Sequence, residues 1–173
     1  SLIRPEATGY GLVYLMREIL AVDGETFEGK KVAISGSGNV AQFAAEKVTQ
    51  LGGKVVTLSD SSGFIHDDDG IDSDELMWIQ EMKNVRRGRI KEYSEHRGYE
   101  YTPRDKGLDH NPLWQTAVDI ALPCATQNEL NGIDAQNLVD NGVRYAGEGA
   151  NMPCTPAAVD VFHANDVKFA PGK

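Results

Sequence analysis

The sequence predicts an α/β fold, a doubly wound and largely parallel sheet with helices on both faces. Short apolar runs rich in β-branched residues alternate with stretches of helical period along all 173 residues. This alternation is typical of β-α-β units, whose strands run parallel. Glycine is frequent, with 18 residues, as expected for tight turns between such elements. The length fits one domain, since domains cluster at roughly 100–150 residues.

The first part of the chain is predicted to hold two helices and two strands in alternation. The first helix ends at residues 23–24, and the strand 31–35 follows it. Helical period returns over 40–51, and a second β-branched run, 55–58, closes at Asp60. The stripe of the first helix recurs at three- and four-residue steps, through Leu12, Leu15, Met16, Ile19 and Leu20.

A third helix is predicted to start at Asp72 or Ser73, with an apolar stripe through Trp78, Met82 and Val85. Residues 88–115 are polar and contain two prolines, so we interpret them as the end of a helix, a short strand and a loop.

The last part of the chain is predicted to alternate in the same way. Strands are expected at 118–122, 143–146 and 167–169, and a weak helix at 135–139. Thr155 is a helix N-cap candidate because a proline follows it at the first helical position.

Composition and charge narrow the classes of function. The formal net charge is -9, whereas domains that bind nucleic acid or membrane surfaces are usually basic, so neither partner is expected. No apolar stretch approaches the roughly 20 residues that span a bilayer. With only Cys124 and Cys154, we expect reduced thiols and a cytoplasmic protein. The ends, Ser1 and the loop-like 171–173, suggest a piece of a longer chain.

The loop after the first strand carries a G-x-G-x-x-A fingerprint, between a strand and a helix as that motif requires. Gly36 permits the tight turn, and Gly38 lets the backbone approach a pyrophosphate. The N-terminus of the following helix offers free N–H groups to the anion. The pattern predicts a dinucleotide site in a Rossmann-like fold; an unrelated glycine-rich turn is the alternative. The fingerprint residues are Gly36, Ser37, Gly38, Asn39, Val40 and Ala41.

Residues beyond the second strand leave the choice of cofactor open. Asp60 lies 24 residues after Gly36, where an acid accepts from the adenosine ribose 2′-hydroxyl and favours NAD. However, Ser61 adds a hydroxyl donor, and Lys83 and Arg86, at i and i+3 on a helix, could hold the 2′-phosphate of NADP. The alternative for these two bases is a solvated charged face.

Five stretches of the chain are recognisable together. They include Pro-Glu-Ala-Thr-Gly-Tyr-Gly near the start and Glu-Gly-Ala-Asn-Met-Pro near the end. The set resembles the cofactor-binding domain of hexameric glutamate dehydrogenases, most closely the NADP-dependent type, and the resemblance covers essentially all 173 residues. The stretches are residues 4–11, 35–41, 59–63, 121–130 and 147–153.

The resemblance implies roles for single residues. Thr8 would bond the nicotinamide carboxamide, Asn39 would lie on the phosphates, and Asn151 would lie by the nicotinamide ribose. Lys83 and Arg86 fall where NADP-type members carry bases near the 2′-phosphate, so NADP is expected, with NAD as the alternative. A stretch along the cofactor ribose would comprise Ala125, Thr126 and Gln127. Each of the three polar residues has a structural alternative: Thr8 or Asn39 as a helix cap, and Asn151 as a turn former.

The resemblance also implies an activity for the whole protein. Glutamate dehydrogenases catalyse the reversible oxidative deamination of L-glutamate to 2-oxoglutarate and ammonia, as homohexamers. Their catalytic lysine and aspartate lie in another domain, so residues 1–173 are expected to be the dinucleotide-binding domain and to be inactive alone. The four histidines show no metal-ligand spacing, and no metal site is expected. A related amino-acid dehydrogenase and a non-catalytic nucleotide sensor are the alternatives.

Overall fold

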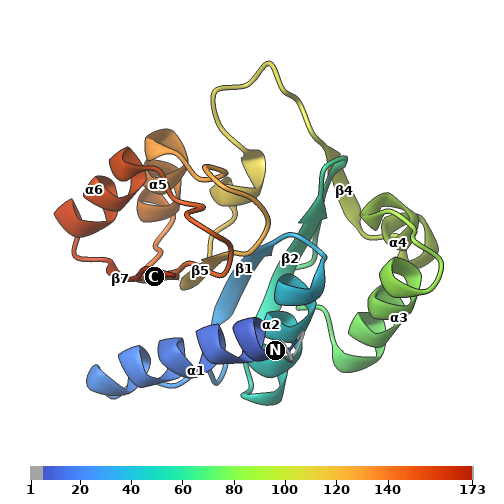
Figure 1. Ribbon diagram of the computed structural model, residues 1–173, viewed down its shortest axis with the longest axis horizontal. Helices are drawn as coiled ribbons and strands as arrows, with labels where there is room; N and C mark the ends of the chain where they lie inside the picture. The colour runs from blue at the N-terminus through green and yellow to red at the C-terminus, as the bar shows by residue number, and fades with distance from the viewer. Residues whose placement is uncertain (1–5, 173) are drawn as a thin grey trace, which may run out of the picture.

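The fold is a single twisted sheet between two layers of helices (Figure 1). The structure is a computed structural model, and it describes residues 6–172. The strands, in the spatial order β4-β3-β2-β1-β5-β6-β7, are β1 (Lys31–Ser35), β2 (Lys54–Asp60), β3 (Gly63–His66), β4 (Glu100–Pro103), β5 (Ile120–Pro123), β6 (Tyr145–Gly147) and β7 (Lys168–Ala170). The helices are α1 (Ala7–Val22), α2 (Asn39–Gln50), α3 (Ser73–Asn84), α4 (Ile90–Arg97), α5 (Gly132–Asp140) and α6 (Pro156–Ala164), with a 3-10 turn η1 at Pro112–Gln115.

Most of the sheet is parallel. β1 pairs in parallel with β2 on one side and β5 on the other, and β6 and β7 extend the parallel part. β3 and β4 add an antiparallel edge beyond β2. The predicted α/β class and the largely parallel sheet are therefore confirmed. Because parallel strands end at the same edge, the loops after β1, β2 and β5 meet there.

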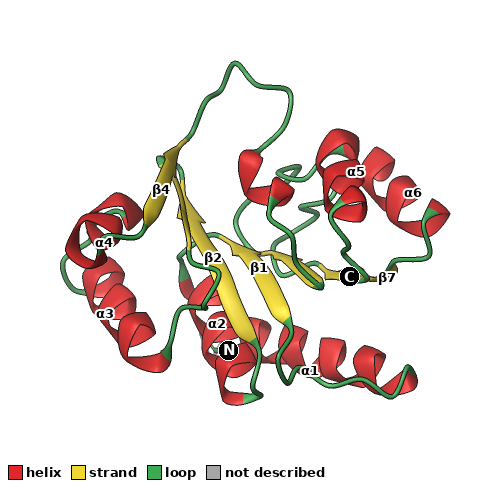
Figure 2. Cartoon of the chain, turned by 180° about the vertical axis from the view of Figure 1, so that it is seen from behind, coloured by secondary structure: helices red, strands yellow, loops and turns green. Residues whose placement is uncertain are grey.

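Helices cover both faces, as predicted (Figure 2). Val32 and Ile34 of β1 pack into a core shared with α1 to α4, whereas Ala33 packs into a second core with η1, α5 and α6. Successive side chains of a strand point to opposite faces of the sheet, which explains this division. Because both faces of β1 are buried, its sequence is a continuous run of apolar residues rather than an alternating one.

Three details of the predicted elements are wrong. The stretch 88–115 contains a separate helix, α4, and 63–66 forms the strand β3, which was not expected. α3 ends at Asn84, so Val85 lies outside the helix and is 75% exposed. Short elements escape detection because periodicity needs a longer window; β3 has four residues and α4 eight.

The first helix buries most of its predicted stripe but not Leu15. Leu12, Met16 and Leu20 are buried as predicted, whereas Leu15 is 45% exposed and Val13, outside the predicted stripe, is fully buried. The cause is a close crossing of α1 and α2 at Gly9, where an added Cβ would lie 2.8 Å from both the Ala44 nitrogen and the Val40 oxygen. Gly9 therefore sets which face of α1 meets the rest of the domain.

Two glycines of α1 provide a matched test of this crossing. Gly9→Ala should lower the free energy of unfolding by about 1–3 kcal/mol, because the new methyl group meets backbone atoms that cannot step aside. Gly11→Ala meets nothing within 4 Å and should raise the free energy of unfolding by up to ~1 kcal/mol through helix propensity. Urea unfolding measures both; equal effects of the two substitutions would contradict the crossing.

Candidate cofactor site

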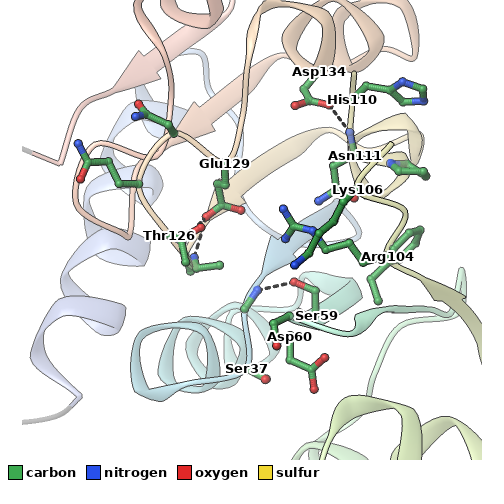
Figure 3. A pocket seen from close by; sticks show the side chains of 18 of the residues that line it. Ser37, Ser59, Asp60, Arg104, Lys106, His110, Asn111, Thr126, Glu129 and Asp134 are labelled. Atoms are coloured by element: carbon green, nitrogen blue, oxygen red, sulfur yellow. Dashed lines mark hydrogen bonds between the residues drawn. The ribbon is translucent and has the colours of Figure 1, made fainter. Parts of the chain in front are cut away.

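A cavity of about 850 Å³ lies at the carboxyl ends of the parallel strands (Figure 3). The loops after β1, β2 and β5 form three of its walls, and the segment 103–112 forms the fourth. Its position, outside the ends of the strands where strand order reverses, is the one that doubly wound folds use for ligands. The predicted site residues that line it are Gly36, Ser37, Gly38, Asn39, Val40, Asp60, Ser61, Ala125, Thr126 and Gln127.

The glycine loop is folded as a phosphate loop requires. Gly36 has φ +91°, and an added Cβ would lie 3.0 Å from the Cys124 oxygen, so only glycine fits without strain. Its N–H donates to Ser59 Oγ at 2.7 Å, which ties the loop to the end of β2. At Gly38 an added Cβ would meet nothing within 4 Å, so a phosphate can reach the backbone there.

The N-terminus of α2 faces this cavity without a side-chain cap. Gly38 is the N-cap residue, and no side chain accepts from the first turn. Asn39 is already helical, so the alternative that it caps α2 is wrong. Thr8 likewise lies inside α1, whose N-cap is Glu6, and does not cap it. The uncapped N–H groups and the positive end of the helix dipole favour an anion at this position.

Asp60 is almost entirely engaged by the protein. Its side chain is 6% exposed, and Oδ1 accepts from the Ser62 N–H at 2.9 Å and from Ser62 Oγ at 2.6 Å. Oδ2 accepts from the Ile90 N–H at 2.7 Å and lies 3.6 Å from Lys83 Nζ. Burial alone would raise the pKa of Asp60, but these hydrogen bonds and the Lys83 charge outweigh it, and the pKa lies below its ordinary value.

The Asp60 carboxylate thereby caps α4 from outside that helix. Ile90 is the first residue of α4, and its N–H would otherwise lack a partner within the helix. Arg89, the N-cap residue, does not itself line the cavity, but its Nη2 donates at 2.8 Å to the Oγ of Ser61, which does. Arg89 was missed by sequence reasoning because its position depends on α4, which the polar pattern of 88–115 did not reveal.

The two predicted bases separate in the structure. Lys83 lies in α3 and pairs with Asp60, whereas Arg86 follows the end of the helix and lies 5.2 Å over the ring of Trp78. The prediction that Lys83 and Arg86 share one helix face is wrong, because α3 ends at Asn84. Neither base lines the cavity.

A second cavity, of about 1030 Å³, adjoins the first, and Asn128 lines both. Thr8 and Asn151 lie in its wall, together with the exposed Leu15 and Met152. Thr8 and Asn151, the predicted nicotinamide contacts, therefore line one cavity, which is separate from the cavity that holds the glycine loop. Among the residues described, neither cavity holds a group of three or more side chains suited to a metal ion.

The loop after β5 is shaped by a partly buried acid that the sequence did not reveal. Glu129 Oε2 accepts from the N–H groups of Ala125 and Thr126 at 2.8 and 2.9 Å. Burial raises the pKa of Glu129 above its ordinary value. The Glu129 carboxylate therefore closes the loop by binding its backbone, whereas Thr126 and Gln127 remain exposed at the cavity wall.

The role of Asp60 has a pH-dependent consequence. Its lowered pKa stabilises the fold above the unfolded-state pKa of about 4, and this stability is lost as the pH falls through the folded-state pKa. Asp60→Asn should therefore cost about 1–3 kcal/mol of unfolding free energy at neutral pH, and less near pH ~3. Urea unfolding at both pH values measures this, with Asp69→Asn, in an exposed turn, as the control. A deficit independent of pH would contradict the account.

Comparison with known proteins identifies the family. A family model for Glutamate/Leucine/Phenylalanine/Valine dehydrogenase matches residues 1–173. The NAD(P)-specific glutamate dehydrogenase of Xylanibacter ruminicola is 53% identical over 173 residues, covering 100% of this chain and 38% of that protein. The NADP-specific glutamate dehydrogenase of Haemophilus influenzae is also 53% identical, with 100% of this chain and 37% of that protein covered.

A solved structure, that of Plasmodium falciparum glutamate dehydrogenase, superimposes with a TM-score of 0.91 at 40% identity, covering 99% of this chain and 36% of that one. The resemblance to glutamate dehydrogenases is confirmed, although the chain spans only 37–38% of the length of the two relatives above. The chain belongs to the glutamate/leucine/phenylalanine/valine dehydrogenase family.

Proposed function

We propose that residues 1–173 are the dinucleotide-binding domain of an NADP-linked glutamate dehydrogenase. The whole protein would convert L-glutamate and NADP reversibly to 2-oxoglutarate, ammonia and NADPH. The observation that carries the proposal is the open backbone at Gly38 beside the uncapped N-terminus of α2, next to the turn in which the Asp60 carboxylate is already paired within the protein. The two relatives of 53% identity are both glutamate dehydrogenases, which supports glutamate as the substrate over the other amino acids named in the family.

The adenosine half of the cofactor would lie in the first cavity. The residues that line it fit the group, because the glycine loop provides N–H donors and a gap that a Cβ would fill. The 2′-phosphate would lie at Ser61, between Lys83 and Arg89. Because Asp60 already accepts from Ser62 and Ile90, its charge opposes the phosphate less than a free carboxylate would.

The nicotinamide half would lie in the second cavity. When bound, the nicotinamide ring supplies the acceptor for the hydride from the amino-acid α-carbon. Thr8 Oγ1 would hold the carboxamide and so fix which ring face is presented, and Asn151 would bond the ribose. Leu12 and Leu15 would cover the ring and keep water from it.

The remaining parts of the reaction would come from elsewhere in the protein. A lysine of lowered pKa and a carboxylate, which activate water and move protons, are expected outside residues 1–173. We therefore expect the 173-residue chain to bind NADPH but to show no glutamate-dependent turnover. Assembly as a homohexamer and a cytoplasmic location, with no nucleic-acid or membrane partner, are part of the same proposal. Among the described residues, no helix is both long and apolar enough to cross a bilayer.

The pyrophosphate position is tested at Gly38. Gly38→Val should abolish measurable binding of both NADPH and NADH, because the side chain fills the space through which the backbone meets the pyrophosphate. The fold should survive, since nothing lies within 4 Å of the new Cβ. Calorimetry with circular dichroism as a folding check measures this, and Gly38→Ala should give a smaller loss. Undiminished affinity in a folded Gly38→Val protein would show that the site is wrong.

The preference for NADP over NAD is tested at Lys83 and Arg89. Replacing Lys83 and Arg89 together by Ala should weaken NADP binding by about 2–4 kcal/mol, from charge-assisted hydrogen bonds with partial screening. NAD lacks the 2′-phosphate and should be affected far less. Arg86→Ala, which removes one positive charge from a neighbouring residue that lies over the Trp78 ring, is the comparison and should change neither affinity appreciably. Equal losses of NADP and NAD in the double variant would refute the assignment.

A further inference from the structure

The fourth wall of the first cavity is the segment 103–112, a loop that has no role in the function proposed above. It joins β4 to η1 and is fixed at both ends. At its start the Arg104 N–H donates to the Ser62 oxygen at 2.8 Å, which continues the antiparallel edge beyond Pro103. At its end the Asn111 N–H donates to Asp134 Oδ1 at 2.8 Å. Between these anchors the loop rises above the sheet as the long arch of Figure 1.

Two cations of this loop face the cavity. Figure 3 shows the side chains of Arg104 and Lys106 extending from the loop toward Ser59 and Asp60. Both residues are exposed, and within residues 6–172 neither side chain has an ion-pair or hydrogen-bond partner. The same cavity is also lined by carboxylates, among them Asp60 and Asp105, yet in the described part of the chain neither cation forms an ion pair with one, so both remain available to an anionic ligand.

Three of the acids that line this cavity have partners other than the two cations. Asp105 Oδ1 accepts from the Gly107 N–H at 2.9 Å, and Asp109 pairs with His110 Nδ1 at 2.8 Å. Asp134 accepts from the N–H groups of Asn111 and Asn131. In the described residues these acids therefore do not pair with Arg104 or Lys106, which leaves the two cations able to contact an anionic ligand.

We propose that Arg104 and Lys106 form a second cationic arm that holds the adenosine 2′-phosphate of the cofactor; the proposal rests on the function proposed above. Arg104 is bonded through its backbone to Ser62, the residue after Ser61, so its side chain starts beside the expected phosphate. Arg89, the N-cap residue of α4, donates from Nη2 to Ser61 Oγ. A phosphate at Ser61 would then be contacted by cations from two separate segments, and a dianion needs more than one cation for full compensation.

The arm makes recognition of the phosphate depend on a segment outside the glycine fingerprint. Lys83 is held by Asp60, so part of its charge is already compensated within the protein. Arg104 and Lys106 have no such partner among the described residues. The loop would thus be a specificity element for NADP over NAD rather than a general anchor for the pyrophosphate, which is expected at the Gly38 side of the cavity.

Two adenosine nucleotides isolate the contribution of the phosphate. The probes are adenosine 2′,5′-bisphosphate, which carries the 2′-phosphate, and AMP, which does not. Arg104→Ala/Lys106→Ala should weaken binding of the bisphosphate roughly tenfold or more, and binding of AMP by less than about threefold. Calorimetry at two salt concentrations measures both, and the salt dependence of bisphosphate binding should become shallower in the variant.

Matched variants distinguish the effect of removing Arg104 and Lys106 from the effect of changing the net charge of the protein. Lys54→Ala/Arg97→Ala removes the same charge from two exposed residues that line neither cavity, and it should leave both affinities unchanged. Arg104→Lys/Lys106→Arg keeps both charges and should retain most of the bisphosphate affinity. Circular dichroism confirms that each variant is folded.

The outcomes distinguish a failure of the cationic arm from a failure of the NADP assignment. If the wild-type chain binds the bisphosphate no more tightly than AMP, the NADP assignment itself fails. If the wild type prefers the bisphosphate and Arg104→Ala/Lys106→Ala keeps that preference, only the cationic arm is overturned. If the variant loses affinity for both nucleotides equally, the cations serve the 5′-phosphate and the 2′-phosphate assignment is overturned.

Discussion

The carboxylate of Asp60 is the interaction on which the nucleotide end of the domain depends. It accepts from Ser62 within its own turn and from Ile90 at the start of α4, and it lies beside Lys83 of α3. One nearly buried charge thus joins the end of β2 to two helices that approach it from separate parts of the chain. A buried carboxylate is tolerated only where donors and a cation replace the lost water, and here all are supplied by the protein.

This arrangement gives an acid at the end of the second strand a different meaning from the usual one. A free carboxylate there accepts from the ribose 2′-hydroxyl and repels a 2′-phosphate. At Asp60 both oxygens are occupied, and the carboxylate instead positions α4 and, with it, Arg89. In the proposed site the same residue type would therefore be compatible with the opposite cofactor preference, because its oxygens already accept hydrogen bonds from the protein. The spacing rule does not describe which partners the carboxylate has.

The sequence was sufficient for the parallel part of the sheet and for the glycine loop after β1, because each rests on a local pattern. Runs of apolar residues predicted β1, β2, β5, β6 and β7, and the spacing of Gly36 and Gly38 predicted the loop that the structure shows. It was insufficient for the edge of the site. β3 and α4 are too short for a periodic signal, and the positions of Arg89 and Arg104 depend on hydrogen bonds to Asp60 and Ser62 that join distant segments. The prediction from the i, i+3 spacing of Lys83 and Arg86 failed because it assumed that the helix continues through Arg86, whereas α3 ends at Asn84.

The most direct measurement of the central claim is the titration of the 2′-phosphate of bound NADP by phosphorus NMR. A phosphate monoester free in water has a second pKa of about 6. Cations that contact the phosphate favour its dianion, so the account predicts that this pKa falls well below its free value in the complex. The pyrophosphate signals, which do not titrate in this range, provide the internal reference. A 2′-phosphate that titrates in the complex as it does in free NADP would contradict the account, because it would show that the phosphate lies in solvent and that the bases around Asp60 do not hold it.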